Sequence, residues 1–162
     1  MYESADELND LQRLLDESAA RAGPHLRSIF TPARALTAPQ LVERFQGRRQ
    51  AAVATVTAGG EPRVAPVDVL LLRGRFFFGT SIRAARIRHL RARPALSLTS
   101  FDGDTFAVIT HGRGALIEFG DDEFTWVDSE FVRVYGGTPS TAEEGSVYVR
   151  VEATALYTLA TA

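Results

Sequence analysis

The sequence predicts a mainly β fold, a six-stranded antiparallel β-barrel with flanking helices and an N-terminal helical extension. Leucines recur at helical spacing near the start of the chain, whereas apolar residues alternate after residue 50. Short strand-like runs in this second part are separated by Gly-containing turns. With 162 residues, 45% of them apolar, the chain can bury one core. We therefore expect a helical segment at residues 1–48 and a barrel domain at residues 49–162.

The N-terminal segment is predicted to form two helices. Residues 5–21 carry four leucines spaced three or four positions apart, the pattern of an amphipathic helix. Gly23, followed by proline, ends this helix. A second helix is expected after Thr37, a favourable N-cap residue, and Gly47 ends it.

Six later runs have the alternation typical of strands. They are residues 51–58, 62–72, 76–80, 95–101, 105–119 and 146–159. Gly59-Gly60 and residues 102–104 provide hairpin turns. An arginine-rich helix is predicted at residues 83–93, and helical spacing returns over residues 124–134. Short turns between successive runs favour an antiparallel barrel with these helices outside it.

The composition excludes several classes of function. A net charge of −2 argues against a nucleic-acid-binding surface, which needs a basic excess. The absence of cysteine excludes disulfides and thiolate metal sites, and the three histidines lack metal-ligand spacing, so no metal is expected. No apolar run approaches 18 residues and the N-terminus is acidic, so we expect no membrane span and a cytoplasmic location.

The stretch FFFGTSIRAARIRHLRARP carries the main chemical signal. A predicted strand runs into Gly79-Thr80-Ser81 and then into a helix, an arrangement in which unpaired backbone amides and small hydroxyl residues can bind an anion. Arg83 and Arg86 lie three positions apart and can flank the same anion. All 18 basic residues are arginine, so any cationic contact is made by a guanidinium group.

Two alternatives remain open for this stretch. On a regular helix Arg88 would point about 160° away from Arg86, so either the helix has barely begun at Arg86 or Arg88 points elsewhere. The five arginines of residues 83–93 can also be read as a solvated basic face with no ligand.

The motifs EPRVAPVD, FFFGTSIRAARIRHLRARP and FAVITHGRG, in this order, resemble the pyridoxamine 5'-phosphate oxidase-like family. In that family a strand ends in Thr, a basic residue follows six positions later, and a proline closes the helix eight beyond; Thr80, Arg86 and Pro94 match this spacing. The resemblance covers residues 50–118 and, more loosely, 146–159. It implies a homodimeric split β-barrel that binds FMN, or the related deazaflavin coenzyme F-420, between subunits.

If the cofactor-binding positions of the family are transferred to this sequence, one strand would lie along the flavin ring. The phosphate site would follow this strand in the chain. Gly79 and Thr80 would contact flavin and phosphate, and Arg86 would pair with the phosphate. The cofactor-binding residues implied are Ala65, Pro66, Val67, Asp68, Gly79, Thr80, Ser81, Arg83, Arg86 and Arg88. No catalytic side chain is assigned, because a bound cofactor carries the hydride chemistry itself.

The C-terminus departs from the named enzyme of that family. The chain ends EATALYTLATA, where pyridoxine phosphate oxidases have an Arg-Leu-Ala-Pro-type segment that holds the substrate. We therefore expect an FMN-dependent oxidoreductase that acts on an unidentified small molecule and is not a true pyridoxine phosphate oxidase. The alternatives are a coenzyme F-420-dependent reductase and a non-catalytic flavin- or haem-binding barrel.

Three further polar residues have two interpretations each. Asp68 could hydrogen-bond a flavin edge or be a satisfied structural carboxylate. His111, where the strand over residues 105–119 would bend at Gly112, could face substrate or be structural. His89 is expected at the surface or at the edge of a dimer.

Overall fold

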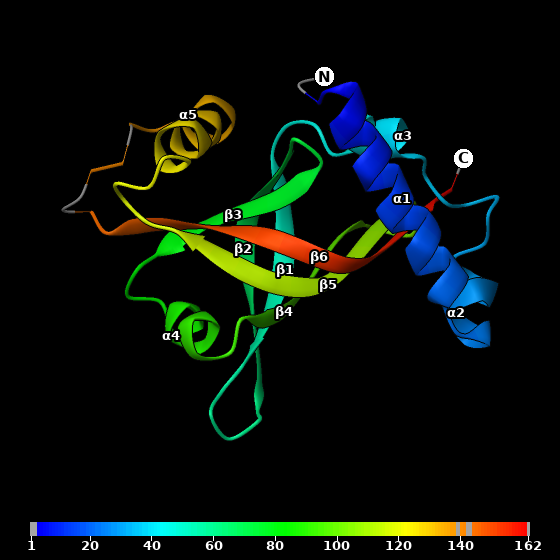
Figure 1. Ribbon diagram of the computed structural model, residues 1–162, viewed down its shortest axis with the longest axis horizontal. Helices are drawn as coiled ribbons and strands as arrows, with labels where there is room; N and C mark the ends of the chain where they lie inside the picture. The colour runs from blue at the N-terminus through cyan, green and yellow to red at the C-terminus, as the bar shows by residue number, and fades with distance from the viewer. Residues whose placement is uncertain (1–2, 139, 142–143, 162) are drawn as a thin grey trace.

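The computed structural model describes residues 3–138, 140–141 and 144–161, and within them the chain forms a closed six-stranded antiparallel barrel (Figure 1). The strand order around the barrel is β1-β2-β3-β6-β5-β4. The strands are β1 (Arg49–Val56), β2 (Pro62–Leu72), β3 (Arg75–Ser81), β4 (Ala95–Asp102), β5 (Phe106–Ile117) and β6 (Ser146–Ala160). The predicted fold class is confirmed.

The helices of the described residues lie outside the barrel. They are α1 (Ala5–Arg21), α2 (Pro24–Ile29), α3 (Ala38–Arg44), α4 (Ala85–Ala92) and α5 (Phe124–Tyr135). Figure 1 shows α1 to α3 gathered at one end of the barrel and α4 at the other. Helix α2 falls in a segment without helical periodicity; it begins at Pro24, whose fixed φ suits the first turn of a helix.

Capping interactions explain where the first and third helices begin. Ser4 and Glu7 form a reciprocal capping box at the start of α1. Thr37 and Gln40 form the corresponding pair at α3, where the Gln40 side chain accepts a hydrogen bond from the Thr37 amide at 2.9 Å. The expected N-cap role of Thr37 is therefore confirmed.

Two hydrophobic clusters hold these elements together. The larger one fills the barrel and continues without a break into α1 and α3, through Leu11 and Phe45. The smaller one lies between α5 and the outer side of β2, β3 and β6, where Phe131 packs on Tyr148 with 4.8 Å between ring centroids. The helical segment and the barrel thus share one continuous core.

Strand β2 changes partners along its length. It pairs with β1 from Arg49↔Val69 to Val56↔Pro62, and with β3 from Val69↔Phe78 to the tight turn at the end of both strands. Among the described residues no strand covers the other edge of residues 62–68, so their backbone groups on that side can bind something else. The strand order closes the barrel, but the first half of β2 and the end of β3 are not paired with each other.

Tyr135, the last residue of α5, fixes the place where the opening begins. Its hydroxyl accepts hydrogen bonds from the amides of Arg49 (3.0 Å) and Val69 (3.1 Å) and lies 2.9 Å from the Val69 carbonyl. Burial raises the pKa of the Tyr135 hydroxyl, so the group is neutral at physiological pH.

The described helices include none that is both long enough and apolar enough to cross a lipid bilayer.

Replacing Tyr135 with Phe is expected to destabilise the protein by about 1–3 kcal/mol, because main-chain groups of β1 and β2 lose their partner. Urea unfolding measures the difference. The control is Tyr157→Phe, which removes a hydroxyl from the half-buried outer side of β6 and should change stability by less than about 0.5 kcal/mol. Equal stabilities for the two variants would contradict the role given to Tyr135.

Candidate functional site

A cationic cleft of about 310 Å³ lies between the β1–β2 hairpin and α4. Its lining residues are Val53, Thr55, Arg63, Val64, Ala65, Ala84, Ala85, Arg86, Arg88 and His89. Three of these are arginines, and none of the described lining residues is a carboxylate. The nearest compensating charge is Glu61, which pairs with Arg63 at 2.7 Å near the hairpin tip. The cleft therefore suits an anionic ligand.

The strand–turn–helix at the cleft is held by short polar contacts. The Thr80 hydroxyl accepts a hydrogen bond of 2.6 Å from Nη1 of Arg86. The turn between them is fixed by Ser81, whose carbonyl accepts from the Ala84 amide (2.9 Å) and whose hydroxyl accepts from the Arg83 amide (3.2 Å). Burial lowers the pKa of Arg86, yet an arginine keeps its charge at any physiological pH.

The first amides of α4 are available to a ligand. Helix α4 begins at Ala85, and its N-cap residue Ala84 has no side chain that could accept a hydrogen bond. The Ile87 amide bonds the Ala84 carbonyl at 3.0 Å, so the amides left for a ligand are those of Ala85 and Arg86, and the helix dipole favours an anion beside them. Thr80, Arg86 and these two amides could together hold an anion.

The position of this helix start decides the first of the alternatives left open by the sequence. Arg86 is only the second residue of α4, and Arg83 lies in the preceding turn. Arg86 and Arg88 both line the cleft. Arg91 pairs with Glu118 at 2.8 Å outside the cleft, and four of the five arginines of residues 83–93 are exposed, so a solvated basic face stays an alternative to a ligand site.

Seven of the ten cleft residues were not among those expected from the sequence. Arg63 lies two positions before Ala65 and so on the same side of β2, which is the signal that could have identified it. His89 is half-buried, and its Nδ1 lies 2.9 Å from the Thr55 hydroxyl of β1. His89 was expected at the surface or at the edge of a dimer; within one chain α4 packs this face of the helix against β1, and the position at a dimer edge stays a prediction.

The other expected residues lie around the cleft without lining it. Val67 faces the core and is 6% exposed, whereas Pro66 and Asp68 are exposed on the opposite side of β2. Gly79 lies against an aromatic ring; a Cβ there would be 3.1 Å from Cε1 of Tyr148, so the backbone comes close because no side chain intervenes. Ser81 and Arg83 form the turn already described.

A buried polar pair supports the chain beside this turn. The Tyr148 hydroxyl donates to Asp128 at 2.7 Å, and the Ser140 amide donates to the same carboxylate at 3.0 Å. Burial raises the pKa of Asp128, but these hydrogen bonds outweigh it and hold the pKa below its usual value. The Gly145 carbonyl, further along, accepts from the Ile82 amide at 2.7 Å and so contacts the turn directly.

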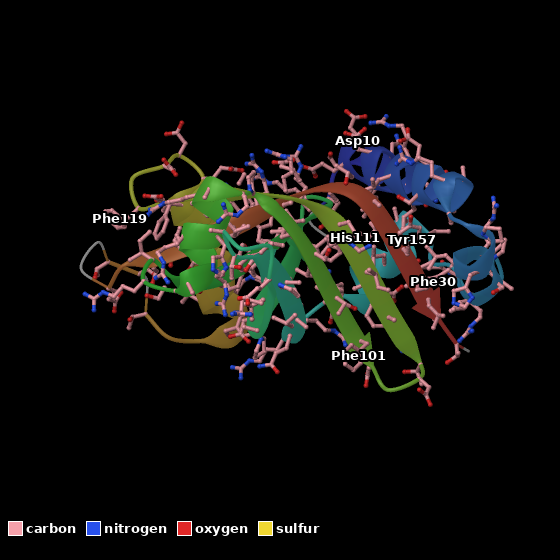
Figure 2. All side chains as sticks on the ribbon, turned by 90° about the horizontal axis from the view of Figure 1, so that it is seen from below. Asp10, Phe30, Phe101, His111, Phe119 and Tyr157 are labelled. Carbon is pink, nitrogen blue, oxygen red and sulfur yellow. The ribbon has the colours of Figure 1, made fainter. Side chains whose placement is uncertain are left out.

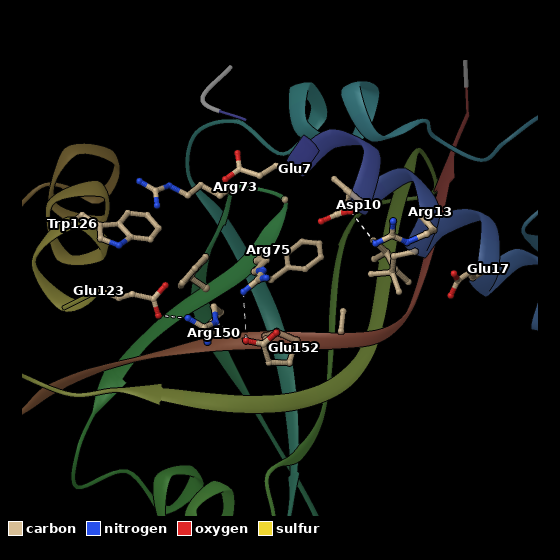
Figure 3. Close-up of a pocket in the computed structure, with 18 residues that line it drawn as sticks. Glu7, Asp10, Arg13, Glu17, Arg73, Arg75, Glu123, Trp126, Arg150 and Glu152 are labelled. Carbon is tan, nitrogen blue, oxygen red and sulfur yellow. Dashed lines mark hydrogen bonds and ion pairs between the residues drawn. The ribbon is translucent and has the colours of Figure 1, made fainter. Parts of the chain in front are cut away.

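A larger cavity, about 520 Å³, lies at the opposite end of β3, between α1, α5 and the β2–β3 turn (Figure 3). Its charges neutralise one another: Arg150 pairs with Glu123 and Glu152, and Arg13 pairs with Asp10 at 2.8 Å. Carboxylates outnumber arginines in its lining. It therefore lacks the excess of positive charge found in the cleft.

Metal-ligating groups do not gather in the part of the chain that the structure describes: no three His, Cys, Asp or Glu residues are placed to share an ion. The chemistry of the cleft is that of guanidinium, hydroxyl, imidazole and backbone amide groups.

The protein is thus a six-stranded antiparallel barrel with a cationic cleft at the uncovered edge of β2. The family model described as pyridoxamine 5'-phosphate oxidase matches residues 37–160, and the chain belongs to this family. No curated protein sequence matches it significantly.

Solved structures of several different proteins share the fold. An F-420 reductase has a TM-score of 0.57 and 20% identity, covering 70% of this chain and 94% of its own. The haem storage protein HutZ from Vibrio cholerae has a TM-score of 0.62 and 18% identity, covering 73% and 91%. A pyridoxamine 5'-phosphate oxidase-related, FMN-binding protein from Nostoc punctiforme has a TM-score of 0.54 and 14% identity, covering 69% and 74%. Because these sequence identities are low, the similarity shows a shared fold and not a shared function.

Asp128→Asn should reduce the free energy of unfolding by about 1–3 kcal/mol at pH 7. Since the folded pKa of Asp128 lies below its unfolded value, the wild-type stabilisation is present above the unfolded pKa of about 4 and is lost as pH falls through the folded pKa. The difference between wild type and variant should thus shrink between pH 5 and 3 in denaturant titrations. A difference independent of pH would contradict a charged Asp128.

Proposed function

We propose that the protein is an oxidoreductase that binds FMN, or the deazaflavin coenzyme F-420, in the cationic cleft and acts on a small molecule. The observation that carries this proposal is the pairing of Thr80 with Arg86 beside the uncovered edge of β2. A phosphate ester and a flat heterocycle need these two features side by side.

The residues present fit such a cofactor. Thr80, Arg86 and the first amides of α4 would hold the phosphate, and Arg88 would add a second guanidinium. Ala65 and its neighbours on β2 offer an apolar surface and unpaired backbone groups to the ring. When bound, a flavin or deazaflavin supplies the hydride-transfer chemistry. The chain's own part is to bind the anion, orient the ring and limit access of water.

The choice between the two cofactors rests on charge. The cleft holds three guanidinium groups and one imidazole, more than a single phosphate requires. This excess favours a cofactor with further anionic groups, such as the acidic tail of coenzyme F-420. The fold is shared with both an F-420 reductase and an FMN-binding protein, which supports either cofactor.

A second candidate function is non-catalytic storage or sensing of a bound cofactor. It is supported by the shared fold of HutZ, a haem storage protein. A cofactor that binds tightly but cannot be reduced by nicotinamide donors or dithionite would favour this candidate over the oxidoreductase.

The proposal includes a homodimer formed through the outer side of β1, β2, β4 and β5. In its middle the side chains are small or apolar, including Ala52, Ala54 and Ile109, and Val64 is 66% exposed, whereas Asp68 and Arg113 lie at its margins. Such a face resembles the core of a subunit interface, because charged groups are depleted there. Val64 also lines the cleft, so a second copy on this face would cover it.

The two cofactors can be compared by titrating the purified chain with FMN and with coenzyme F-420 and following absorbance and fluorescence. Binding of either with micromolar or better affinity supports the proposal, and the tighter of the two identifies the cofactor. Absence of binding by both would overturn it.

Arg86→Ala should weaken cofactor binding by about 1.5–3 kcal/mol, about 10- to 150-fold in Kd, through loss of a charge-assisted hydrogen bond. Calorimetric or fluorescence titration measures the change. The matched control is Arg91→Ala on the same helix, whose side chain pairs with Glu118 outside the cleft. Equal losses in the two variants would mean that α4 contributes only general positive charge.

Ile109→Glu should convert the dimer to a monomer, because it places a charge in an uncharged interface. Sedimentation velocity measures the oligomeric state, and circular dichroism checks the fold. Glu130→Gln on α5 serves as the surface control. A wild-type chain that sediments as a monomer would contradict the dimer.

A further inference from the structure

The larger cavity lies where the N-terminal helix meets the barrel, and it has the volume of a small-molecule site. Its 520 Å³ fall within the range of about 300–1,000 Å³ that is usual for such sites. Helices α1 and α5 form its walls, and β3 and β6 lie beneath it (Figure 3). The family match begins at residue 37, so the wall formed by α1 lies outside the matched part of the chain. The cavity shares no lining residue with the cationic cleft.

The turn between β2 and β3 places an arginine in this cavity on an unfavourable backbone. The turn consists of Arg73 and Gly74, whose φ angles are 50° and 70°. Glycine tolerates positive φ, and asparagine, aspartate or glycine is usual at the first position of such a turn. In the part of the chain that the structure describes, Arg73 is the only residue other than glycine with a positive φ. This conformation indicates a role for the Arg73 side chain.

The two arginines on either side of Gly74 keep their hydrogen-bond donors free. The guanidinium group of Arg73 lies over the Trp126 ring, 4.4 Å from its centroid, and this contact uses none of the N–H donors. Arg75 approaches one carboxylate oxygen of Glu152 at 3.7 Å, which is beyond hydrogen-bond distance. Among the described residues, neither guanidinium group forms a hydrogen bond. Together they can bind a carboxylate.

A carboxylate lies beside these arginines without neutralising them. A Cβ added at Gly74 would lie 3.0 Å from the carbonyl oxygen of Glu7, so the turn packs directly against α1 at this residue. The Glu7 side chain caps α1, where its Oε2 accepts a hydrogen bond from the Ser4 amide at 2.8 Å. No ion pair within the described residues joins Glu7 to Arg73 or Arg75, although all three line the cavity. Opposite charges therefore start from neighbouring positions of the main chain and remain unpaired.

The other charged side chains of the lining already have partners of opposite charge. The pairs are Arg150 with Glu123 and Glu152, Asp10 with Arg13, and Glu17 with Arg21. Asp10 lies at the outer surface of α1 (Figure 2), where solvent weakens such a pair. The groups left for a ligand are Glu7, Arg73 and the donors of Arg75.

We propose that the larger cavity binds an α-amino acid with an aromatic side chain. Its carboxylate accepts hydrogen bonds from Arg73 and Arg75, and its ammonium group donates to Glu7. An α-amino acid carries both charges on one carbon atom, which suits opposite charges that are neighbours but unpaired. A ligand with a single charge would leave either the arginines or Glu7 without a partner.

The aromatic side chain of the ligand lies against Trp126. This indole lines the cavity, and Phe77 supports it edge-on with 5.5 Å between ring centroids. A third ring can join such a pair in the offset or edge-on arrangements that aromatic rings prefer.

The first experiment uses the intrinsic fluorescence of Trp126, the only tryptophan of the chain. The purified chain is titrated at pH 7 with L-phenylalanine, whose amino and carboxyl groups are both charged at this pH. We expect a saturable change of fluorescence with a Kd of about 1 mM or lower. The analogues 3-phenylpropionate, which lacks the ammonium group, and phenethylamine, which lacks the carboxylate, should each bind at least about 10-fold more weakly.

The second experiment compares variants of the two charged sides by calorimetry. Arg73→Gln removes the guanidinium group, and Glu7→Gln removes the charge but keeps a side chain that can cap α1. Each should raise the Kd for L-phenylalanine about 10-fold or more, with the fold checked by circular dichroism. The control is Arg27→Gln, which removes an exposed arginine of α2 outside the cavity and should leave the Kd unchanged.

The outcomes concern this cavity and leave the cofactor cleft aside. The inference fails if L-phenylalanine does not bind saturably, or if either analogue binds as tightly as L-phenylalanine. It also fails if either variant keeps the wild-type Kd, or if Arg27→Gln loses as much affinity as they do. Titrations with FMN and coenzyme F-420 test the proposed function separately, because the cleft and the cavity have no lining residue in common.

Discussion

The site depends on one constraint, the early separation of β2 from β3. Strand β2 pairs with β1 over residues 62–69, but β3 pairs with β2 only up to Phe78 and then continues along β6. The hydroxyl of Tyr135 binds the main chain where this separation begins. The separation leaves one edge of β2 without a strand partner and brings the end of β3 beside α4. An antiparallel barrel paired at every edge would have no comparable cleft.

The distribution of charge, rather than its total, gives the cleft its chemistry. The chain is mildly acidic, with a net charge of −2, yet the cleft contains three arginines and no carboxylate among its described lining residues. The larger cavity beneath α1 has arginines too, but Glu and Asp side chains pair with three of the four. Volume alone would therefore select the larger cavity. The site that we propose is the cleft, because among the described residues no carboxylate forms an ion pair with Arg86 or Arg88, and both lie beside open backbone groups.

In the dimer that we propose, the outer face of β1, β2, β4 and β5 would link dimerisation to cofactor binding. Val64 belongs both to this face and to the cleft, so a second subunit that covered the face would also close the cleft. The phosphate end of the cofactor would then be held within one subunit and the ring end between two.

The sequence by itself determined the barrel, most of its strands and the turn that joins Thr80 to Arg86, because alternation, helical spacing and the Thr80–Arg86 interval are local properties of the chain. It did not determine that α4 begins as late as Ala85, that His89 packs against Thr55, or that Arg63 joins the cleft. Each of these depends on residues distant in sequence that meet only when β1, β2 and α4 pack together. Sequence spacing gives the side of a strand or helix on which a residue lies, and tertiary packing decides what that side faces.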